Sequence, residues 1–157
     1  MKESITIRLA TRKDAAAIAL ESMTEIEHGL GWSWNPVRVA KAIRDRNINV
    51  AVAMADEAML GFGIMKYEDE VAHLLLFAVR EESRRQGVGS ALLAWLEKVA
   101  SVAGVNRLRS EARASNVVAR AFYRKHGYVE MEIVRGMYPK GIEGVRFEKI
   151  VDESVEE

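Results

Sequence analysis

The chain has 157 residues, of which 49% are hydrophobic and 29% charged, so its composition is that of an ordinary globular protein and we expect a single domain over 1–157. Its 23 basic and 23 acidic residues cancel, and bulk charge therefore gives no support for a nucleic-acid partner or an anionic membrane surface. The lack of cysteine excludes disulfides, thiolate metal sites and a cysteine nucleophile and fits a cytoplasmic location, and no apolar run approaches the ~20 residues of a membrane span.

The first third of the sequence predicts one strand followed by two helices. Residues 5–9 (ITIRL) alternate between apolar and polar side chains, which is typical of a strand. The letters TRKD that follow have the pattern of a capping box, so we expect a helix over 11–27. After a loop over 27–34, an Asn-Pro pair is typical of a helix start, and the second helix should cover 35–46.

The middle of the sequence predicts three strands and a long helix. Residues 48–55 and 59–67 alternate in polarity around a short turn, which indicates an antiparallel hairpin. Residues 71–79 (VAHLLLFAV) are apolar almost throughout, so we expect a strand that is buried on both faces. A turn over 84–90 then leads into a helix that ends near Gly104.

The last third predicts a strand over 106–112, a helix over 116–127 and an antiparallel strand pair over 128–134 and 144–151. The predicted order is therefore βααβββαβαββ. It indicates an α/β (α+β) domain with a mixed, mostly antiparallel central sheet and helices on both faces.

The turn SRRQGVGS combines two arginines and two glycines at the start of a helix. Glycines leave backbone amides open at the positive end of the helix dipole, and arginine binds phosphate through two parallel hydrogen bonds. The pattern predicts an anion site, with a charged tight turn as the plainer alternative. A P-loop is excluded because no Lys-Ser/Thr pair follows the last glycine, and a dinucleotide fingerprint is excluded because its third glycine would stand at Leu92.

The same residues, from Arg84 to Gly89, resemble the R-x-x-G-x-G acyl-CoA motif of the GNAT superfamily of N-acetyltransferases. Residues 111–128 (EARASNVVARAFYRKHGY) are similar to its second signature, N-x₂-A-x₃-Y-x₃-G-Y/F, and the predicted element order matches the family over nearly the whole chain. The letters SEARASN and the tyrosine that follows look most like the ribosomal-protein alanine and protein N-terminal acetyltransferase branch. The sequence departs from this branch at Met137 and Gly144, which bears on the acceptor.

This resemblance implies a GNAT-type fold and transfer of an acetyl group from acetyl-CoA to a primary amine without a metal. It implies Glu111 as the base and Tyr123 as the acid for the leaving thiolate. His73 and Glu70 are alternatives for the base. Glu111 could instead form a solvated cross-strand ion pair, and Tyr123 could simply be a core residue.

The resemblance also implies where acetyl-CoA is held. The expected cofactor-binding residues are Phe77, Ala78, Val79, Arg84, Arg85, Gln86, Gly87, Val88, Gly89, Ser90 and Asn116. Asn116 has the residue type of a helix cap under either interpretation.

Acceptor specificity is expected in the loops over 27–36 and 135–144, with Trp32, Trp34 and Tyr138 as contacts; the tryptophans could equally staple the first helices to the sheet. A peptide or protein N-terminus is the favoured acceptor. A small amine (polyamine, amino acid or antibiotic) is the alternative, and a non-catalytic CoA-binding sensor is the rival class. The expected partners are thus acetyl-CoA and an amine acceptor, with no nucleic acid and no membrane, and a homodimer is left open.

Overall fold

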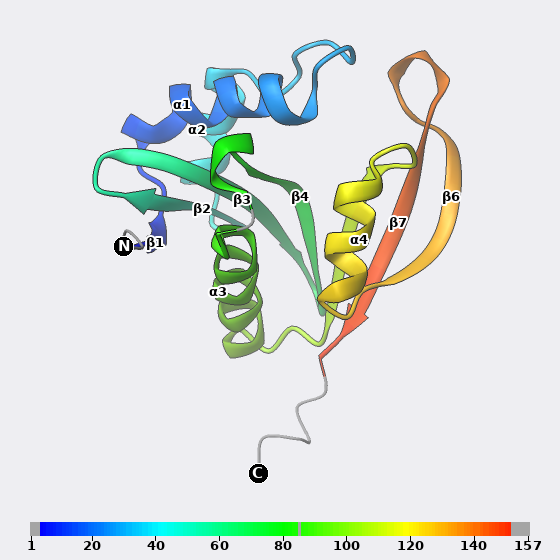
Figure 1. Cartoon of the computed structure of the whole chain (residues 1–157). Helices are drawn as coiled ribbons and strands as arrows, with labels where there is room; N and C mark the ends of the chain where they lie inside the picture. Colours follow the sequence, from blue (N-terminus) through cyan, green and yellow to red (C-terminus); the bar gives the residue numbers. More distant parts are fainter. Residues whose placement is uncertain (1–3, 85, 152–157) are drawn as a thin grey trace.

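A computed structural model describes residues 4–84 and 86–151 of the chain. One seven-stranded sheet with the order β1-β2-β3-β4-β5-β7-β6 runs through this part, with helices against both of its faces (Figure 1). Only β4 and β5 run parallel; every other neighbouring pair is antiparallel. The predicted mixed, mostly antiparallel sheet with helices on both faces is confirmed.

The elements follow the predicted order. The strands are β1 (Thr6–Leu9), β2 (Ile48–Ala55), β3 (Ala58–Glu68), β4 (Val71–Val79), β5 (Arg107–Arg113), β6 (Val129–Tyr138) and β7 (Ile142–Ile150). The helices are α1 (Ala15–Glu21), α2 (Pro36–Arg44), α3 (Val88–Val102) and α4 (Val117–Lys125), with short turns η1 (Arg12–Asp14), η2 (Ser22–Ile26), η3 (Glu81–Ser83) and η4 (Pro139–Gly141). None of the helices in 4–84 and 86–151 is long and apolar enough to cross a membrane.

The first predicted helix is formed by three consecutive pieces, η1, α1 and η2. The predicted capping pattern is present at its start, where the Thr11 amide donates to the Asp14 carboxylate at 2.8 Å. Its last turn, η2, is a π-helix rather than a continuation of the α-helix. Single π-turns of this kind occur frequently at functional sites because they redirect the side chains that follow.

Two hydrophobic cores lie on the two faces of the sheet. In one of them, α3 buries Leu92, Leu93 and Leu96 at helical spacing against the sheet, together with Tyr123 of α4. In the other, α1 and α2 cover the opposite face, and Phe62 of β3 is fully buried there.

Strand β4 contributes to both cores, although it is not buried on both faces as predicted. Its residues alternate between buried and half-buried. An irregularity in its pairing with β3, between Ile64 and Met65, leaves Leu75 without a ladder partner and changes which face the following residues occupy. Leu74 therefore packs in the α3 core and Leu76 in the α1–α2 core, which explains the continuous apolar run.

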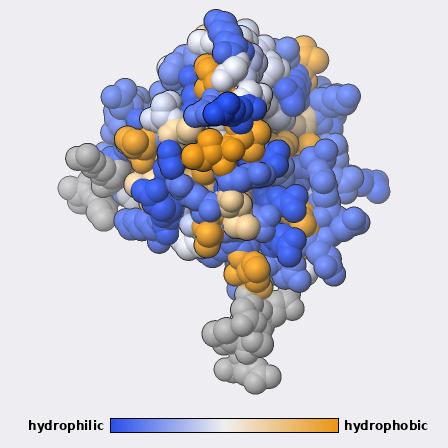
Figure 2. All heavy atoms as spheres, turned by 90° about the vertical axis from the view of Figure 1, so that its right-hand side faces the viewer, coloured by the Kyte–Doolittle hydropathy of each residue, from blue (hydrophilic) through white to orange (hydrophobic). Residues whose placement is uncertain are grey.

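The C-terminal hairpin is longer than predicted, and this corrects the position of Tyr138. The residue was expected in a loop but is the last residue of β6. A tight turn, in which Lys140 and Gly141 have φ values of 66° and 73°, closes the hairpin. Because this turn is short, both strands continue closer to the tip of the hairpin than the polarity pattern indicates. Along the outer strand β6, the exposed residues include Val129, Met131 and Ile133. Figure 2 shows apolar patches of this kind within a mostly hydrophilic face.

Candidate active site

The parallel strands β4 and β5 are paired at one end only. Their ladder joins Val71 to Arg107, Ala72 to Leu108 and His73 to Arg109. Beyond these pairs the two strands diverge (Figure 1), so residues 74–79 have no β5 partner. Backbone N–H and C=O groups need hydrogen-bond partners. The gap between β4 and β5 is therefore edged by backbone groups that can bind an extended ligand.

The N-terminus of α3 opens next to the end of β4. Gly87 caps it in a left-handed conformation with φ 81°, and no side chain supplies a capping hydrogen bond. The first intrahelical donor is the Ala91 amide, which reaches the Gly87 carbonyl at 3.0 Å. The amides of Val88, Gly89 and Ser90 precede it and have no intrahelical acceptor. The backbone geometry at this end of a 15-residue helix therefore suits an anion, and the anion site stays a prediction.

For the arginines of the motif, the structure gives no direct support for phosphate binding. The Arg84 guanidinium contacts the Glu25 carboxylate at 2.5 Å and the Val79 carbonyl at 3.3 Å. Arg85 lies outside the described residues. Because the described arginine already has partners within the chain, the phosphate-binding role of both stays a prediction.

Several of the expected cofactor residues offer only their backbone to a ligand. Ala78 and Val88 are buried in the two cores. The Gln86 side chain is exposed and donates to the Glu82 carbonyl at 3.4 Å. Asn116 accepts from the Ala119 amide at 3.0 Å, which confirms its prediction as the cap of α4.

Phe77 and Val79 line the gap together with a residue that the sequence analysis missed. The Phe77 ring stacks on Phe122 of α4 with centroids 5.5 Å apart. A Cβ on Gly89 would lie 3.1 Å from Phe122 and 3.5 Å from Val79, so glycine allows α3, α4 and β4 to approach closely at this point. The packing of an aromatic residue against a motif glycine has no signature in the sequence.

Ser90 has an unexpected neighbour in His126. The ring Nε2 lies 2.9 Å from the Ser90 hydroxyl, and Nδ1 lies 2.8 Å from the Phe122 carbonyl. The residue is half-buried and joins the C-terminus of α4 to the first turn of α3.

The predicted base lies where β4 and β5 begin to diverge. His73 Nε2 is 3.5 Å from one Glu111 oxygen, and Arg146 Nε is 3.5 Å from the other. The register explains this meeting, because His73 pairs with Arg109, two residues before Glu111. The neighbouring His73 lowers the pKa of the Glu111 carboxyl below its ordinary value; burial opposes this effect, and Arg146 adds to it.

The other candidate base, Glu70, is exposed in the turn before β4. It forms no ion pair with any residue in the part of the chain that the structure describes. Of the alternatives, His73 is the one that the structure brings beside Glu111.

Tyr123 is almost fully buried among aromatic rings. Its ring centroid lies 5.4 Å from that of Tyr128 and 5.1 Å from that of Phe147. Burial raises the pKa of the Tyr123 phenol to about 12, and the neighbouring Ser110 hydroxyl acts in the opposite direction. The phenol therefore keeps its proton at neutral pH.

Tyr138 reaches this site from the end of β6. The half-buried side chain has a pKa raised to about 12, first by burial and then by the negative charge of Glu111 and by Tyr123, while Arg113 lowers it. The charges of Glu111 and Arg113 on β5 thus both act on Tyr138. Among the expected base residues, the tertiary structure brings His73 and Glu111 into contact.

The two tryptophans have different surroundings. Trp34 is 8% exposed within the α1–α2 core, and the Arg38 guanidinium lies 3.8 Å from the ring centroid. In this position Trp34 packs between the first helices and the sheet and links them. Trp32 is 44% exposed and donates from Nε1 to the Ala19 carbonyl at 3.1 Å, so it retains surface for an acceptor.

Glu27 fixes the loop between α1 and α2 from the inside. Its carboxylate accepts from the Ser22 hydroxyl at 2.8 Å, the Ser33 amide at 2.8 Å and the Trp34 amide at 3.2 Å, as well as from the Ser33 hydroxyl. Burial alone would raise the pKa of Glu27, but these hydrogen bonds outweigh it and the pKa lies below the ordinary value. The loop over 27–34 is therefore held as one compact unit.

We predict that Glu27 makes the protein sensitive to acid. A carboxyl whose folded-state pKa is lowered stabilises the fold above its ordinary pKa, near 4.5, and loses this contribution as pH falls through the folded value. In Glu27→Gln, the free energy of unfolding at pH 7 should fall by on the order of 1 kcal/mol, and it should decline less steeply toward pH 3 than in the wild type.

Urea titrations across this pH range measure the effect. Glu21→Gln is the control, because burial raises the pKa of Glu21 and gives its contribution the opposite sign. Parallel pH profiles for the wild type and Glu27→Gln would contradict the prediction.

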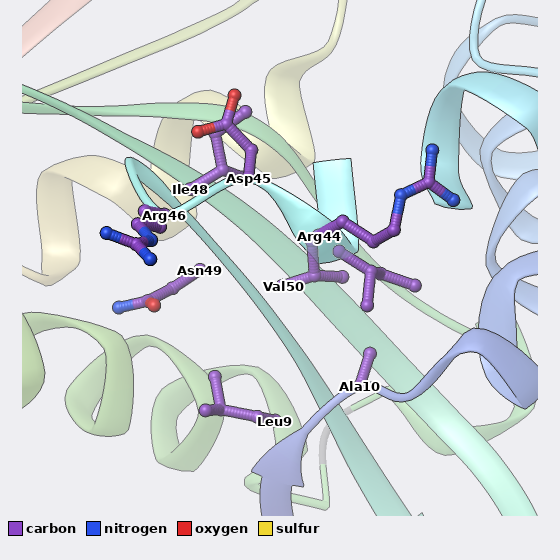
Figure 3. Close-up of a pocket in the computed structure, with 9 residues that line it drawn as sticks. Leu9, Ala10, Arg44, Asp45, Arg46, Ile48, Asn49 and Val50 are labelled. Carbon is purple, nitrogen blue, oxygen red and sulfur yellow. The ribbon is translucent and has the colours of Figure 1, made fainter. Parts of the chain in front are cut away.

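A pocket at the far edge of the sheet has no part in this site. It lies between the end of β1, the C-terminus of α2 and the start of β2, where Arg44, Asp45 and Arg46 line it beside apolar residues (Figure 3). None of the expected catalytic, cofactor or acceptor residues borders it.

Comparisons with known proteins were made for the sequence and for the structure. Residues 16–128 match the model of the Acetyltransferase (GNAT) family. The chain is 33% identical over 95 residues to an uncharacterized N-acetyltransferase of Methanocaldococcus jannaschii, covering 60% of this chain and 61% of that protein. It is 34% identical over 106 residues to the ribosomal protein bS18-alanine N-acetyltransferase of Escherichia coli, covering 68% of this chain and 71% of that protein.

Solved structures show the same fold. Ard1 from Thermoplasma volcanium superposes with a TM-score of 0.85 at 26% identity, over 95% of this chain and 99% of that chain. The PaiA N-acetyltransferase from Thermoplasma acidophilum, solved in complex with coenzyme A, gives a TM-score of 0.79 at 24% identity, over 94% and 99% of the two chains.

Proposed function

The chain belongs to the GNAT acetyltransferase family, and from this premise we propose that it is an N-acetyltransferase that moves an acetyl group from acetyl-CoA to a primary amine, with a peptide or protein N-terminus as acceptor. The observation that carries the proposal is the gap between β4 and β5, which lies beside the open N-terminus of α3 and holds the His73–Glu111 pair. We further propose that the single domain covers the whole sequence.

The residues present fit acetyl-CoA, which supplies an acetyl group activated as a thioester. The amides of residues 88–90 and the uncapped helix end suit a pyrophosphate, because backbone N–H groups and the helix dipole both favour an anion. The unpaired edge over 74–79 suits an extended chain with amide groups. Apart from its chain neighbours, no atom of residues 4–84 and 86–151 lies within 4 Å of the position of a Cβ on Gly87, so these residues leave room for a ligand against the backbone.

A base must remove a proton from the acceptor amine. We assign this task to the His73–Glu111 pair. With its lowered pKa, Glu111 stays ionised at neutral pH and is a weak base by itself, whereas imidazole in general changes protonation between pH 5 and 8. The Glu111 carboxylate, 3.5 Å away, stabilises the imidazolium that forms when His73 accepts the proton.

Tyr123 is assigned to the leaving sulfur. Its phenol keeps its proton at neutral pH and can donate it, or a hydrogen bond, toward the negative charge that develops on the thiolate. The sequence has no cysteine that could serve as an acyl-accepting thiol, which favours direct transfer between donor and acceptor.

An N-terminal acceptor is supported by two observations. The E. coli relative is named for acetylation of an alanine in a ribosomal protein, and a relative from Sulfurisphaera tokodaii, 36% identical over 70 residues, is named an N-alpha-acetyltransferase. In this chain, the charge of Glu111 acts on the half-buried Tyr138 at the end of β6, and we expect this side chain to contact the first residues of a peptide.

The test is thiol release from acetyl-CoA against a mixed panel of amines. The panel contains peptides with varied N-terminal residues, lysine peptides with blocked N-termini, and small amines. We expect turnover with free N-termini. Turnover confined to small amines would overturn the acceptor, and tight acetyl-CoA binding without turnover would favour a CoA-binding sensor.

A further inference from the structure

The ends of β4 and β5 are connected across their gap by one segment of the chain. Residues 21–28, which we call the bridging segment, comprise the last residue of α1, the π-turn η2 and the two residues after it. In Figure 1 the helical stretch that begins with α1 extends toward the end of the sheet where β4 and β5 diverge, and its last turn, η2, contacts β4.

Ion pairs attach the bridging segment to the β4 side. Glu21 contacts Arg80 at 2.8 Å, and Glu25 contacts Arg84 at 2.5 Å. Arg80 directly follows β4 in the chain, and Arg84 follows the short turn η3 that comes next. These pairs involve residues 21 and 25, whereas the other end of the segment, residues 26–28, is held by β5.

Arg113, the last residue of β5, holds that other end. Its Nη2 donates to the carbonyls of Ile26 and His28, each at 2.6 Å. These carbonyls belong to residues 85 or more positions away in the sequence, at the point where the π-turn ends. In residues 4–84 and 86–151, no other side chain of β5 is hydrogen-bonded to the bridging segment.

The position of Arg113 relates this anchor to the proposed acceptor site. Arg113 is two residues after Glu111, and alternate residues of a strand lie on the same face. Its positive charge also acts on Tyr138 of β6. Opposite Arg113 in the β5–β7 ladder is Gly144, and the side chains of Met137 and Tyr138 occupy the space that a Cβ at this position would need.

We propose that Arg113 is a positioning residue for the acceptor. By anchoring Ile26 and His28 to the end of β5, it sets the distance from Glu111 to the bridging segment and to the loop that follows this segment. Because Glu27 ties the loop over 27–34 to Ser22, loss of this anchor loosens the loop together with the bridging segment. This inference rests on the proposed function of the site.

The experiment compares Arg113→Met with Arg107→Met, a matched control on the same strand. Arg107 has an exposed side chain and an ion pair with Glu148 at 3.8 Å, at the far end of β5. The acceptor is the free-N-terminal peptide that the wild type acetylates fastest. We expect the KM for this peptide to rise at least ~10-fold in Arg113→Met, with kcat within threefold and the Kd of acetyl-CoA within twofold. Arg107→Met should leave all three unchanged.

Two further measurements separate positioning from a merely structural role. Arg113→Lys keeps a donor for one carbonyl and should recover part of the KM, although lysine lacks the planar fork of arginine. Hydrogen–deuterium exchange should become faster in residues 22–34 of Arg113→Met and stay unchanged elsewhere in the chain, a readout that needs no acceptor.

The proposal is overturned if the acceptor KM stays at the wild-type value, if the Kd of acetyl-CoA weakens to the same extent, or if exchange in residues 22–34 does not change. A wild type that acetylates no amine would instead refute the proposed function, and the exchange measurement would still decide whether Arg113 anchors the bridging segment.

Discussion

Replacing Tyr123 by phenylalanine is expected to lower kcat by about 10²- to 10⁴-fold, the range that general acid catalysis contributes, and to leave the Kd of acetyl-CoA within twofold. The change removes one hydroxyl and retains the ring that packs against Tyr128 and Phe147. Because burial keeps this phenol protonated, its loss removes a proton donor for the leaving sulfur without changing the charge of the ground state.

Tyr128→Phe is the matched control. This variant also removes a hydroxyl from a buried tyrosine of the same aromatic cluster. The Tyr128 hydroxyl donates to Glu97 at 2.7 Å and has no part in the proposed chemistry. The control should lose stability and keep kcat. Steady-state rates and calorimetric acetyl-CoA titration separate the two variants. Full activity of Tyr123→Phe would refute the acid, and equal losses in both variants would show that the hydroxyls matter only for packing.

Replacing Gly87 by valine is expected to raise the Kd of acetyl-CoA at least ~100-fold, which corresponds to about 2.7 kcal/mol. Gly87 has φ 81°, a conformation that disfavours L-residues by roughly 1–2 kcal/mol and β-branched ones by more. The open space at its Cβ position is where the proposed ligand approaches the amides of residues 88–90. A valine therefore both strains the cap of α3 and obstructs the anion site.

Gly104→Val separates these two effects. Gly104 follows the other end of α3, has φ 88°, and likewise has no atom within 4 Å of its Cβ position. The two variants should lose similar amounts of unfolding free energy, but only Gly87→Val should lose acetyl-CoA. A Gly87→Val protein that binds acetyl-CoA as tightly as the control would show that the turn does not hold the phosphates.

Much of the fold could be predicted from the sequence because its elements are encoded by local patterns. The caps at Asn35 and Asn116 are present as predicted, and so is the order of strands and helices. The errors arose where tertiary contacts overrode local signals. The bulge in β4 moves its buried residues from one face of the sheet to the other, so an alternating strand looked buried on both faces, and the left-handed turn at Lys140 extended β6 as far as Tyr138.

The candidate site was predictable only in part. Glu111, Tyr123 and the glycine turn carry family signatures at fixed spacing. Phe122, His126, Arg113 and Arg146 carry none, since each acts through a neighbour that is distant in sequence. Arg84 shows the converse: its place in the motif indicates a phosphate ligand, but only the structure reveals its ion pair with Glu25.

The sequence by itself determined the class of fold, the family and the residues of the glycine turn, because helix periodicity, capping residues and motif spacing are local properties. The tertiary structure decided how β4 and β5 diverge, which group lies beside Glu111, and how the loop after α1 is attached to β5. These features depend on strand register and on contacts between residues up to 87 positions apart, and such contacts form only when the whole chain has packed around its two cores.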